Sequence, residues 1–116
     1  MGVLVSKPAY LQKGGNGSTI SYSRVSLKAL VSDSYFADDA NWDKVVFYYR
    51  DATGNQKTYV NASAAGGAVS GTMKVSSRAR ANTWQLYKIL IVDFDGGSHV
   101  IQRSSLDSSD DIVVSN

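Results

Sequence analysis

The chain has 116 residues, a formal net charge of +2 at pH 7, one histidine and no cysteine. The missing cysteines exclude disulfide staples and thiolate zinc sites. The small net charge argues against nucleic acid or an anionic membrane as a partner. The length fits one domain over residues 1–116, and no apolar run reaches the ~18 residues that membrane insertion requires.

The choice of residues favours strands over helices. All ten acidic residues are Asp, and the chain contains no Glu. Glu is a good helix former, whereas Asp competes for nearby backbone groups and prefers turns and caps. Seven Tyr suit a pleated surface, and ten Gly suit turns. The composition therefore predicts an all-β chain without long helices.

The N-terminal segment is the least defined part of the pattern. Residues 3–11 are expected to form a weak strand, with Pro8 marking an edge or a break. The glycine-rich segment 12–18 then turns the chain. The sequence leaves open whether residues 1–23 pair within the same sheet or reach to a neighbour.

A longer strand is predicted for residues 19–32. Its apolar residues alternate in one phase up to Tyr22 and in the other from Val25 onwards. Such a change of phase predicts a β-bulge or a strand that crosses between two sheets.

The rest of the chain alternates apolar runs with turn residues. In the run after the polar loop 33–43, Val45, Phe47 and Tyr49 share one face, and Val46 and Tyr48 share the other. The strand predicted at 83–93 needs a bulge near Tyr87, because only then do all four of its large apolar residues point inward: Trp84, Leu86, Ile89 and Ile91. Strands are predicted at 44–50, 56–61, 69–76, 83–93, 98–103 and 111–114. About seven to eight short strands at this spacing indicate a β-sandwich, with a barrel as the alternative.

The segment 83–97 resembles a strand of bacterial immunoglobulin-like (Ig-like) domains. It is similar to their Trp-x-Leu-x-x-Ile-x-ϕ-x-Asp-x-x-Gly pattern, in which ϕ is apolar, and it follows a short strand, 71–75, that ends in Val. Other segments are similar to the core strands and the closing strand of that family, at 25–33, 45–50 and 111–116. The chain lacks the cysteine pair of antibody domains and inserts the loop 33–43.

This resemblance implies an Ig-like β-sandwich of about seven to eight antiparallel strands. It also implies a function: a non-catalytic structural or adhesive module of a bacterial extracellular or cell-surface protein. The expected partners are the neighbouring domains of a longer chain. Likeness of fold says little about a binding site, which has to be argued from the residues themselves.

The loop 33–43 suggests an alternative function, a carbohydrate-binding module of an extracellular glycan-active enzyme or a phage tail protein. Sugar rings stack their C–H faces on aromatic rings, and Asp and Asn accept hydrogen bonds from sugar hydroxyls. The candidate polysaccharide-binding residues are Tyr35, Asp38, Asp39, Asn41, Trp42 and Tyr48. The competing interpretation is that these aromatic side chains cover one end of the core.

Acidic residues in two loops suggest a calcium site, if those loops meet. Calcium takes about six to eight oxygen ligands, and carboxylates on adjoining loops can supply several of them. The candidate ligands are Asp33, Asp39, Asp93 and Asp95. The alternative is that they are solvated turn residues, because Asp is common in turns for backbone reasons alone.

Catalysis is not expected. His99 is the only histidine, and it lies within a predicted strand without a nucleophile elbow. A glycosidase would need two carboxyl groups held about 5–10 Å apart in a cleft. A modest basic group consists of Lys74, Arg78, Arg80 and Lys88 and is interpreted as a solvated face, since a nucleic-acid site needs more charge and interleaved exposed aromatic residues.

Overall fold

The structure is a computed structural model that describes residues 2–64 and 68–116. Most of its regular elements are strands, as the composition predicts. In chain order the strands are β1 (Leu4–Ser6), β2 (Leu11–Gln12), β3 (Ser18–Tyr22), β4 (Lys44–Arg50), β5 (Lys57–Ser63), β6 (Val69–Met73), β7 (Thr83–Val92), β8 (Ser98–Gln102) and β9 (Ile112–Ser115). The helical elements are α1 (Arg24–Leu30) and the 3-10 turns η1 (Asp39–Asn41), η2 (Arg103–Ser105) and η3 (Ser108–Asp110).

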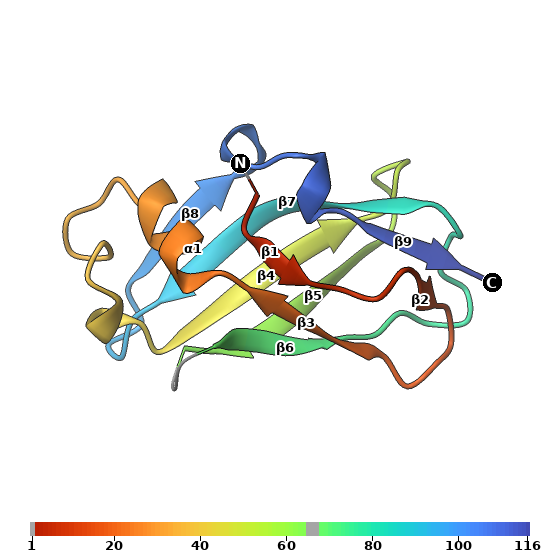
Figure 1. The fold of residues 1–116 in the computed structure, drawn as a ribbon, viewed down its shortest axis with the longest axis horizontal. Coiled ribbons are helices and arrows are strands. Elements are labelled where there is room, and N and C mark those ends of the chain that lie inside the picture. The colour runs from red at the N-terminus through yellow and green to blue at the C-terminus, as the bar shows by residue number, and fades with distance from the viewer. Residues whose placement is uncertain (1, 65–67) are drawn as a thin grey trace.

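These strands form one curled sheet in the order β1-β3-β6-β5-β4-β7-β9-β2, and β8 pairs with the other end of β7. The curl brings β1 and β3 in front of β4 and β5, so the sheet encloses its own core (Figure 1). Every pair is antiparallel except β2–β9, which is parallel. The all-β prediction is therefore confirmed. The expectation of only antiparallel strands is wrong, because the short β2 runs alongside the C-terminal β9.

Aromatic side chains join the two halves of the curl. The ring of Tyr22 on β3 stacks on Phe47 of β4, with centroids 3.5 Å apart. The hydroxyl groups of Tyr22 and Tyr49 lie 2.9 Å apart, and burial raises the pKa of both. Val45, Phe47 and Tyr49 are fully buried, as their alternation predicts, and each contributes about 1.5–3 kcal/mol of burial free energy.

The strand predicted for residues 19–32 is wrong in its second half. The chain leaves β3 at Tyr22, and Ser23 then caps the seven-residue helix α1 by accepting a hydrogen bond from the Ser26 amide. Only Leu27 of this helix is buried, while Val25 projects into solvent. The change of phase was therefore a strand-to-helix boundary. No helix in the described ranges is long and apolar enough to cross a bilayer.

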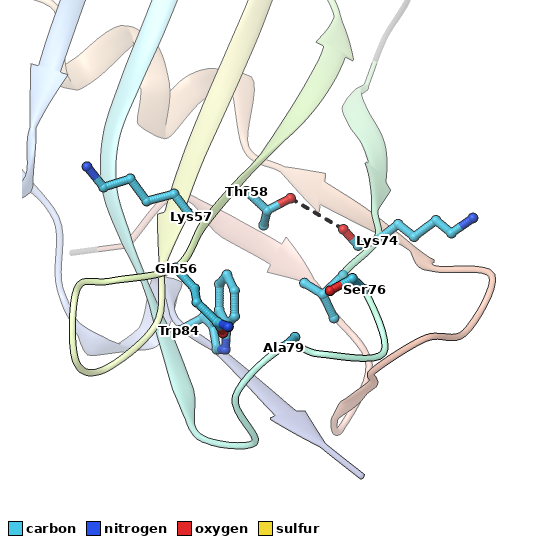
Figure 2. A pocket seen from close by; sticks show the side chains of 8 residues that line it. Gln56, Lys57, Thr58, Lys74, Ser76, Ala79 and Trp84 are labelled. Atoms are coloured by element: carbon cyan, nitrogen blue, oxygen red, sulfur yellow. Dashed lines mark hydrogen bonds between the residues drawn. The ribbon is translucent and has the colours of Figure 1, made fainter.

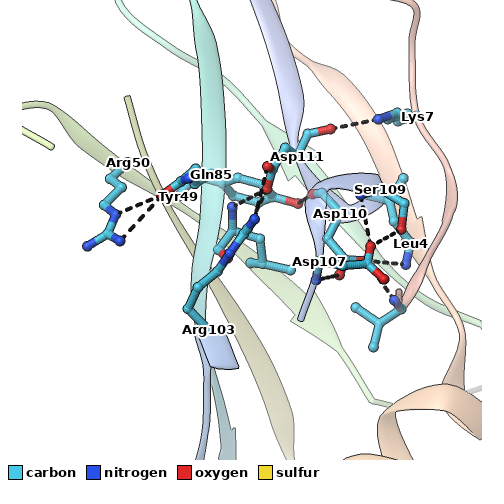
Figure 3. A network of polar contacts seen from close by, with 12 residues as sticks. Leu4, Lys7, Tyr49, Arg50, Gln85, Arg103, Asp107, Ser109, Asp110 and Asp111 are labelled. Atoms are coloured by element: carbon cyan, nitrogen blue, oxygen red, sulfur yellow. Dashed lines mark hydrogen bonds and ion pairs between the residues drawn. The ribbon is translucent and has the colours of Figure 1, made fainter. Parts of the chain in front are cut away.

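The N-terminal segment belongs to the sheet, which answers the question that the sequence left open. β1 pairs with β3, β2 pairs with β9, and Pro8 lies in the break between them. Buried Asp110 holds this segment by accepting hydrogen bonds from the amides of Val3 (2.6 Å) and Leu4 (3.1 Å) (Figure 3). This network ties the first strand to the turn that precedes the last one.

Candidate functional site

The loop 33–43 uses its largest aromatic residues as core. Trp42 is only 3% exposed, and its indole Nε1 donates a hydrogen bond of 2.7 Å to the Phe36 carbonyl oxygen. Phe36 is buried as well, and its ring packs 5.8 Å from that of His99 on β8. The ring of Trp42 is therefore closed off from any ligand that approaches from solvent.

The polar residues of this loop hold its own backbone. Asp33 accepts hydrogen bonds from two amides that follow it, and Asp38 caps η1 through the Ala40 amide. Asn41 donates to the Tyr35 carbonyl oxygen. Asp39 lies 3.4 Å from the Arg24 guanidinium and 3.6 Å from the Lys28 ammonium group. Short polar side chains in such positions are typical of turns.

The six candidate sugar-binding residues do not share one surface. Tyr35 stays on the loop, 46% exposed, and Tyr48 lies on β4 with its side chain on the outer face of the sheet. Tyr35 is next to Asp93 and Asp95, and desolvation together with these carboxylates raises its pKa. The two loops thus meet, but they meet without Trp42 or Tyr48.

Three of the four candidate calcium ligands have separate partners, and the fourth, Asp95, lies near Tyr35. Oδ1 of Asp93 accepts hydrogen bonds from the amides of Asp95 (2.9 Å) and Gly97 (2.7 Å), which closes the β7–β8 turn. Asp39 pairs with cations of α1, and Asp33 holds its own loop. Within residues 2–64 and 68–116, no three acidic or histidine side chains converge as metal ligands. The predicted set is therefore not assembled.

The outer face of β5, β4 and β7 presents a different group of aromatic and basic residues. We call it the tyrosine face; it consists of Tyr48, Tyr59, Tyr87, Arg50, Lys57 and Lys88. Tyr59 is 57% exposed, and the rings of Tyr59 and Tyr87 each lie 6.2 Å from that of Tyr48. The planes of the Tyr59 and Tyr87 rings are tilted by 44° and 57° to that of Tyr48, so the three rings are not coplanar.

A β-bulge places two of these residues side by side. Tyr48 pairs with Lys88 and Tyr49 pairs with Leu86, so Tyr87 is the extra residue on β7. Both Tyr87 and Lys88 therefore project from the outer face, whereas regular alternation would bury one of them. The predicted bulge near Tyr87 is confirmed, because Trp84, Leu86, Ile89 and Ile91 are all buried.

The cations of this face lie over its rings. The Lys88 ammonium group is 4.6 Å from the centroid of Tyr48 and 5.9 Å from that of Tyr87. The Arg50 guanidinium is 5.2 Å, and the Lys57 ammonium 5.8 Å, from the centroid of Tyr87. Cation–π contacts of this kind are worth about 0.5–1 kcal/mol at exposed sites, and they keep the charged groups close to the aromatic surface.

Charge is segregated around this face. Strands β4, β5, β7 and β8 contain no acidic residue at all. The nearest acids lie beyond the strand ends, in Asp43, Asp51 and Asp93. Burial alone would raise the pKa of Asp51, but hydrogen bonds from Thr53 and the Gln56 amide hold it well below its usual range. The face itself carries positive charge only.

Two hollows border the tyrosine face. One, of about 420 Å³, is lined by a mixture of polar and apolar residues: Lys44, Val46, Tyr48, Tyr59, Asn61, Leu90 and Val92. The other, of about 290 Å³, lies between the start of β5 and the segment 74–76 that follows β6 (Figure 2). Its lining includes Trp84 and also Lys57, which belongs to the tyrosine face. Strands β5 and β6 approach closely at Gly71, where a Cβ would collide with the Asn61 carbonyl oxygen. Among the described residues, the register of these two strands pairs Ser63 with Ser70.

Sequence reasoning identified Tyr48 but missed its neighbours. The alternation in 44–50 and 57–63 places Tyr48 and Tyr59 opposite the buried residues, which was a usable signal. Tyr87 becomes their neighbour because β4 pairs with both β5 and β7, and the residue pattern within each strand does not reveal this pairing.

Comparisons with protein-family models, with curated proteins and with solved structures found no match to this chain.

Proposed function

We propose that this chain is a non-catalytic adhesive module of a bacterial extracellular protein, an Ig-like β-sandwich that binds polysaccharide on its tyrosine face. The observation that carries the proposal is the cluster of Tyr48, Tyr59 and Tyr87, three rings grouped on one sheet face, of which Tyr59 is exposed and the other two are partly exposed. The C–H groups of a sugar carry partial positive charge and pack on the electron-rich face of an aromatic ring.

The hollow of about 420 Å³ supports this proposal. Its lining includes Tyr48 and Tyr59, the apolar Val46 and Leu90, and the polar groups of Asn61 and Lys44. Ligand sites combine an apolar surface with a few polar groups in this way. One or two sugar rings fit such a volume.

The chemistry of the surface supports binding rather than hydrolysis. Glycoside hydrolysis uses two carboxyl groups about 5–10 Å apart, and the three strands of this face, β4, β5 and β7, carry none. The single histidine lies on β8 beside the ring of Phe36. The face can therefore hold a sugar chain, but it offers no acid–base pair to cleave it.

The test is a glycan-array measurement followed by affinity measurements with Tyr59→Ala/Tyr87→Ala. We expect the double variant to bind at least about tenfold more weakly, because aromatic anchors commonly contribute more than ~1 kcal/mol each. The matched control is Tyr35→Ala, which removes an exposed tyrosine from the loop 33–43 and should bind like wild type. Loss of binding in the control alone would place the site in the loop and refute the proposal.

A further inference from the structure

We infer that the polysaccharide is acidic, carrying carboxylate or sulfate groups that Arg50, Lys57 and Lys88 bind while the tyrosines stack on its rings. The inference rests on the proposed function and adds the class of ligand to it. Three features of the tyrosine face support it: its cations lie over the aromatic rings, they form no ion pair with a carboxylate of the described residues, and two of them are direct partners across neighbouring strands.

The cations occupy the ring faces that a sugar would use. Lys88 lies over Tyr48, and Arg50 and Lys57 both lie over Tyr87. A neutral sugar has to displace these groups and forfeit their cation–π contacts before it can stack. An acidic sugar instead provides each displaced cation with a charged hydrogen-bond partner, and such bonds are about twice as strong as neutral ones.

No carboxylate of the described residues neutralises this group. Elsewhere in the molecule, Arg80 and Arg103 each lie within 3.4 Å of an aspartate carboxylate. By contrast, no ion pair of the described residues includes Arg50, Lys57 or Lys88. The Arg50 guanidinium donates hydrogen bonds to the neutral side-chain oxygen of Gln85, at 3.4 Å. The positive charge of the face is thus available to a ligand.

Two of the cations oppose each other across the strands. Arg50 on β4 and Lys57 on β5 are direct partners in the antiparallel register. Like charges in that position destabilise a sheet, so folding does not explain the pair. An anionic group bound between them removes the repulsion. An arrangement that costs stability and favours a ligand is what a binding site commonly shows.

An acidic glycan suits this face better than single-stranded nucleic acid. A nucleic-acid strand carries one phosphate per nucleotide along its whole length. It would approach the carboxylates of Asp43 and Asp51 where it leaves the face, and the net charge of +2 offers little long-range attraction. A polysaccharide can carry its charges more sparsely than this, and densely charged polymers such as polygalacturonate serve only as probes of the face.

The experiment compares dextran with dextran sulfate, which share a backbone, and adds polygalacturonate as a carboxylate polymer. Binding is measured by calorimetry at 50 and 200 mM salt, with a dT20 oligonucleotide as the nucleic-acid arm. We expect dextran sulfate, polygalacturonate or both to bind at least about tenfold more tightly than dextran. That binding should weaken as salt rises. Which acidic polymer binds more tightly distinguishes sulfate from carboxylate as the preferred group.

The decisive variant is Arg50→Gln/Lys57→Gln, with Lys28→Gln on α1 as a control that removes charge away from the face. The double variant should lose at least about tenfold in affinity for the acidic polymer and show a smaller salt dependence, whereas the control should bind nearly as wild type does. The variant removes a like-charge pair but also the cation–π contacts of these two residues with Tyr87, so its unliganded melting temperature should change little. An unchanged affinity in a folded double variant would overturn the inference.

The remaining outcomes separate this inference from the proposed function. Tyrosine-dependent binding of dextran that equals that of dextran sulfate at both salt concentrations would overturn the inference and leave the proposed function standing. Binding of dT20 in preference to every glycan would overturn both. Binding to none of these polymers and to no glycan on the array would also overturn both.

Discussion

The loop 33–43 and the tyrosine face both place aromatic rings beside charged side chains, but they use them differently. In the loop, Trp42 and Phe36 are buried and the acids hold backbone amides or pair with cations of α1. On the face, Tyr59 is exposed and the nearby cations contact rings. The same residue types thus stabilise the fold in one region and stay available to a ligand in the other. Clustering of residue types along a sequence is therefore a weaker guide to a site than their exposure after folding.

The sharpest test of this contrast is Trp42→Ala. Removing a buried indole leaves a cavity, so we expect the free energy of unfolding to fall by about 3–5 kcal/mol in urea titrations followed by circular dichroism. Glycan binding by the fraction that remains folded should not change. A variant as stable as wild type would show that the ring is not part of the core.

A smaller effect is expected for Asp33→Ala. The variant loses the carboxylate that accepts the Tyr35 and Phe36 amides, which should lower stability by about 1 kcal/mol, as loss of a cap does. Asp33→Asn keeps an acceptor oxygen and serves as the conservative control, with most of the stability retained. If calcium raised the melting temperature of wild type but not of Asp33→Ala, the residue would instead be a metal ligand.

Lowering the pH should destabilise the turn between β4 and β5, where Asp51 lies at the end of the tyrosine face. The pKa of Asp51 is depressed in the folded state by its hydrogen bonds, while an unfolded Asp titrates near 3.9. Its ionised form therefore stabilises the fold above about pH 4, and this contribution is lost as pH falls through the folded pKa. Melting temperatures measured from pH 5 downward should decline less steeply in Asp51→Asn than in wild type. Parallel declines would contradict this assignment.

The smallest effect on stability is expected for Tyr59→Ala. Its ring projects into solvent from β5, so the free energy of unfolding should change by no more than about 0.5 kcal/mol. The measurement is the same urea titration, compared directly with Trp42→Ala. A loss of several kcal/mol would mean that the face packs against something in solution and is not a free surface.

Local pattern predicted the core strands well and the helix not at all. Alternation correctly identified the inner side chains of β4, and it required the bulge at Tyr87 that the structure shows. It failed at residues 24–30, because the same short run of apolar residues fits a strand and one face of a helix. The cap at Ser23 decides between them, and Ser is too common in this chain to be a signal by itself.

The candidate sites were harder to predict, because a loop sequence does not show which way its rings point. Trp42 lies among acidic residues in the sequence and was predicted to bind sugar, but in the folded loop its indole is buried. Tyr48 was singled out correctly as an outward residue of β4. Its partners Tyr59 and Tyr87 lie far from it in sequence and become neighbours only through strand pairing.

By itself the sequence determined that this chain is built from strands, which residues of β4 and β7 face inward, and where the bulge occurs. These properties depend on neighbours a few residues apart, which the sequence displays directly. The tertiary structure alone decided that β2 runs parallel to β9, that Trp42 is buried and that three tyrosines and three cations share one face. Such properties depend on strand order and register, which arise from contacts between residues far apart in the chain.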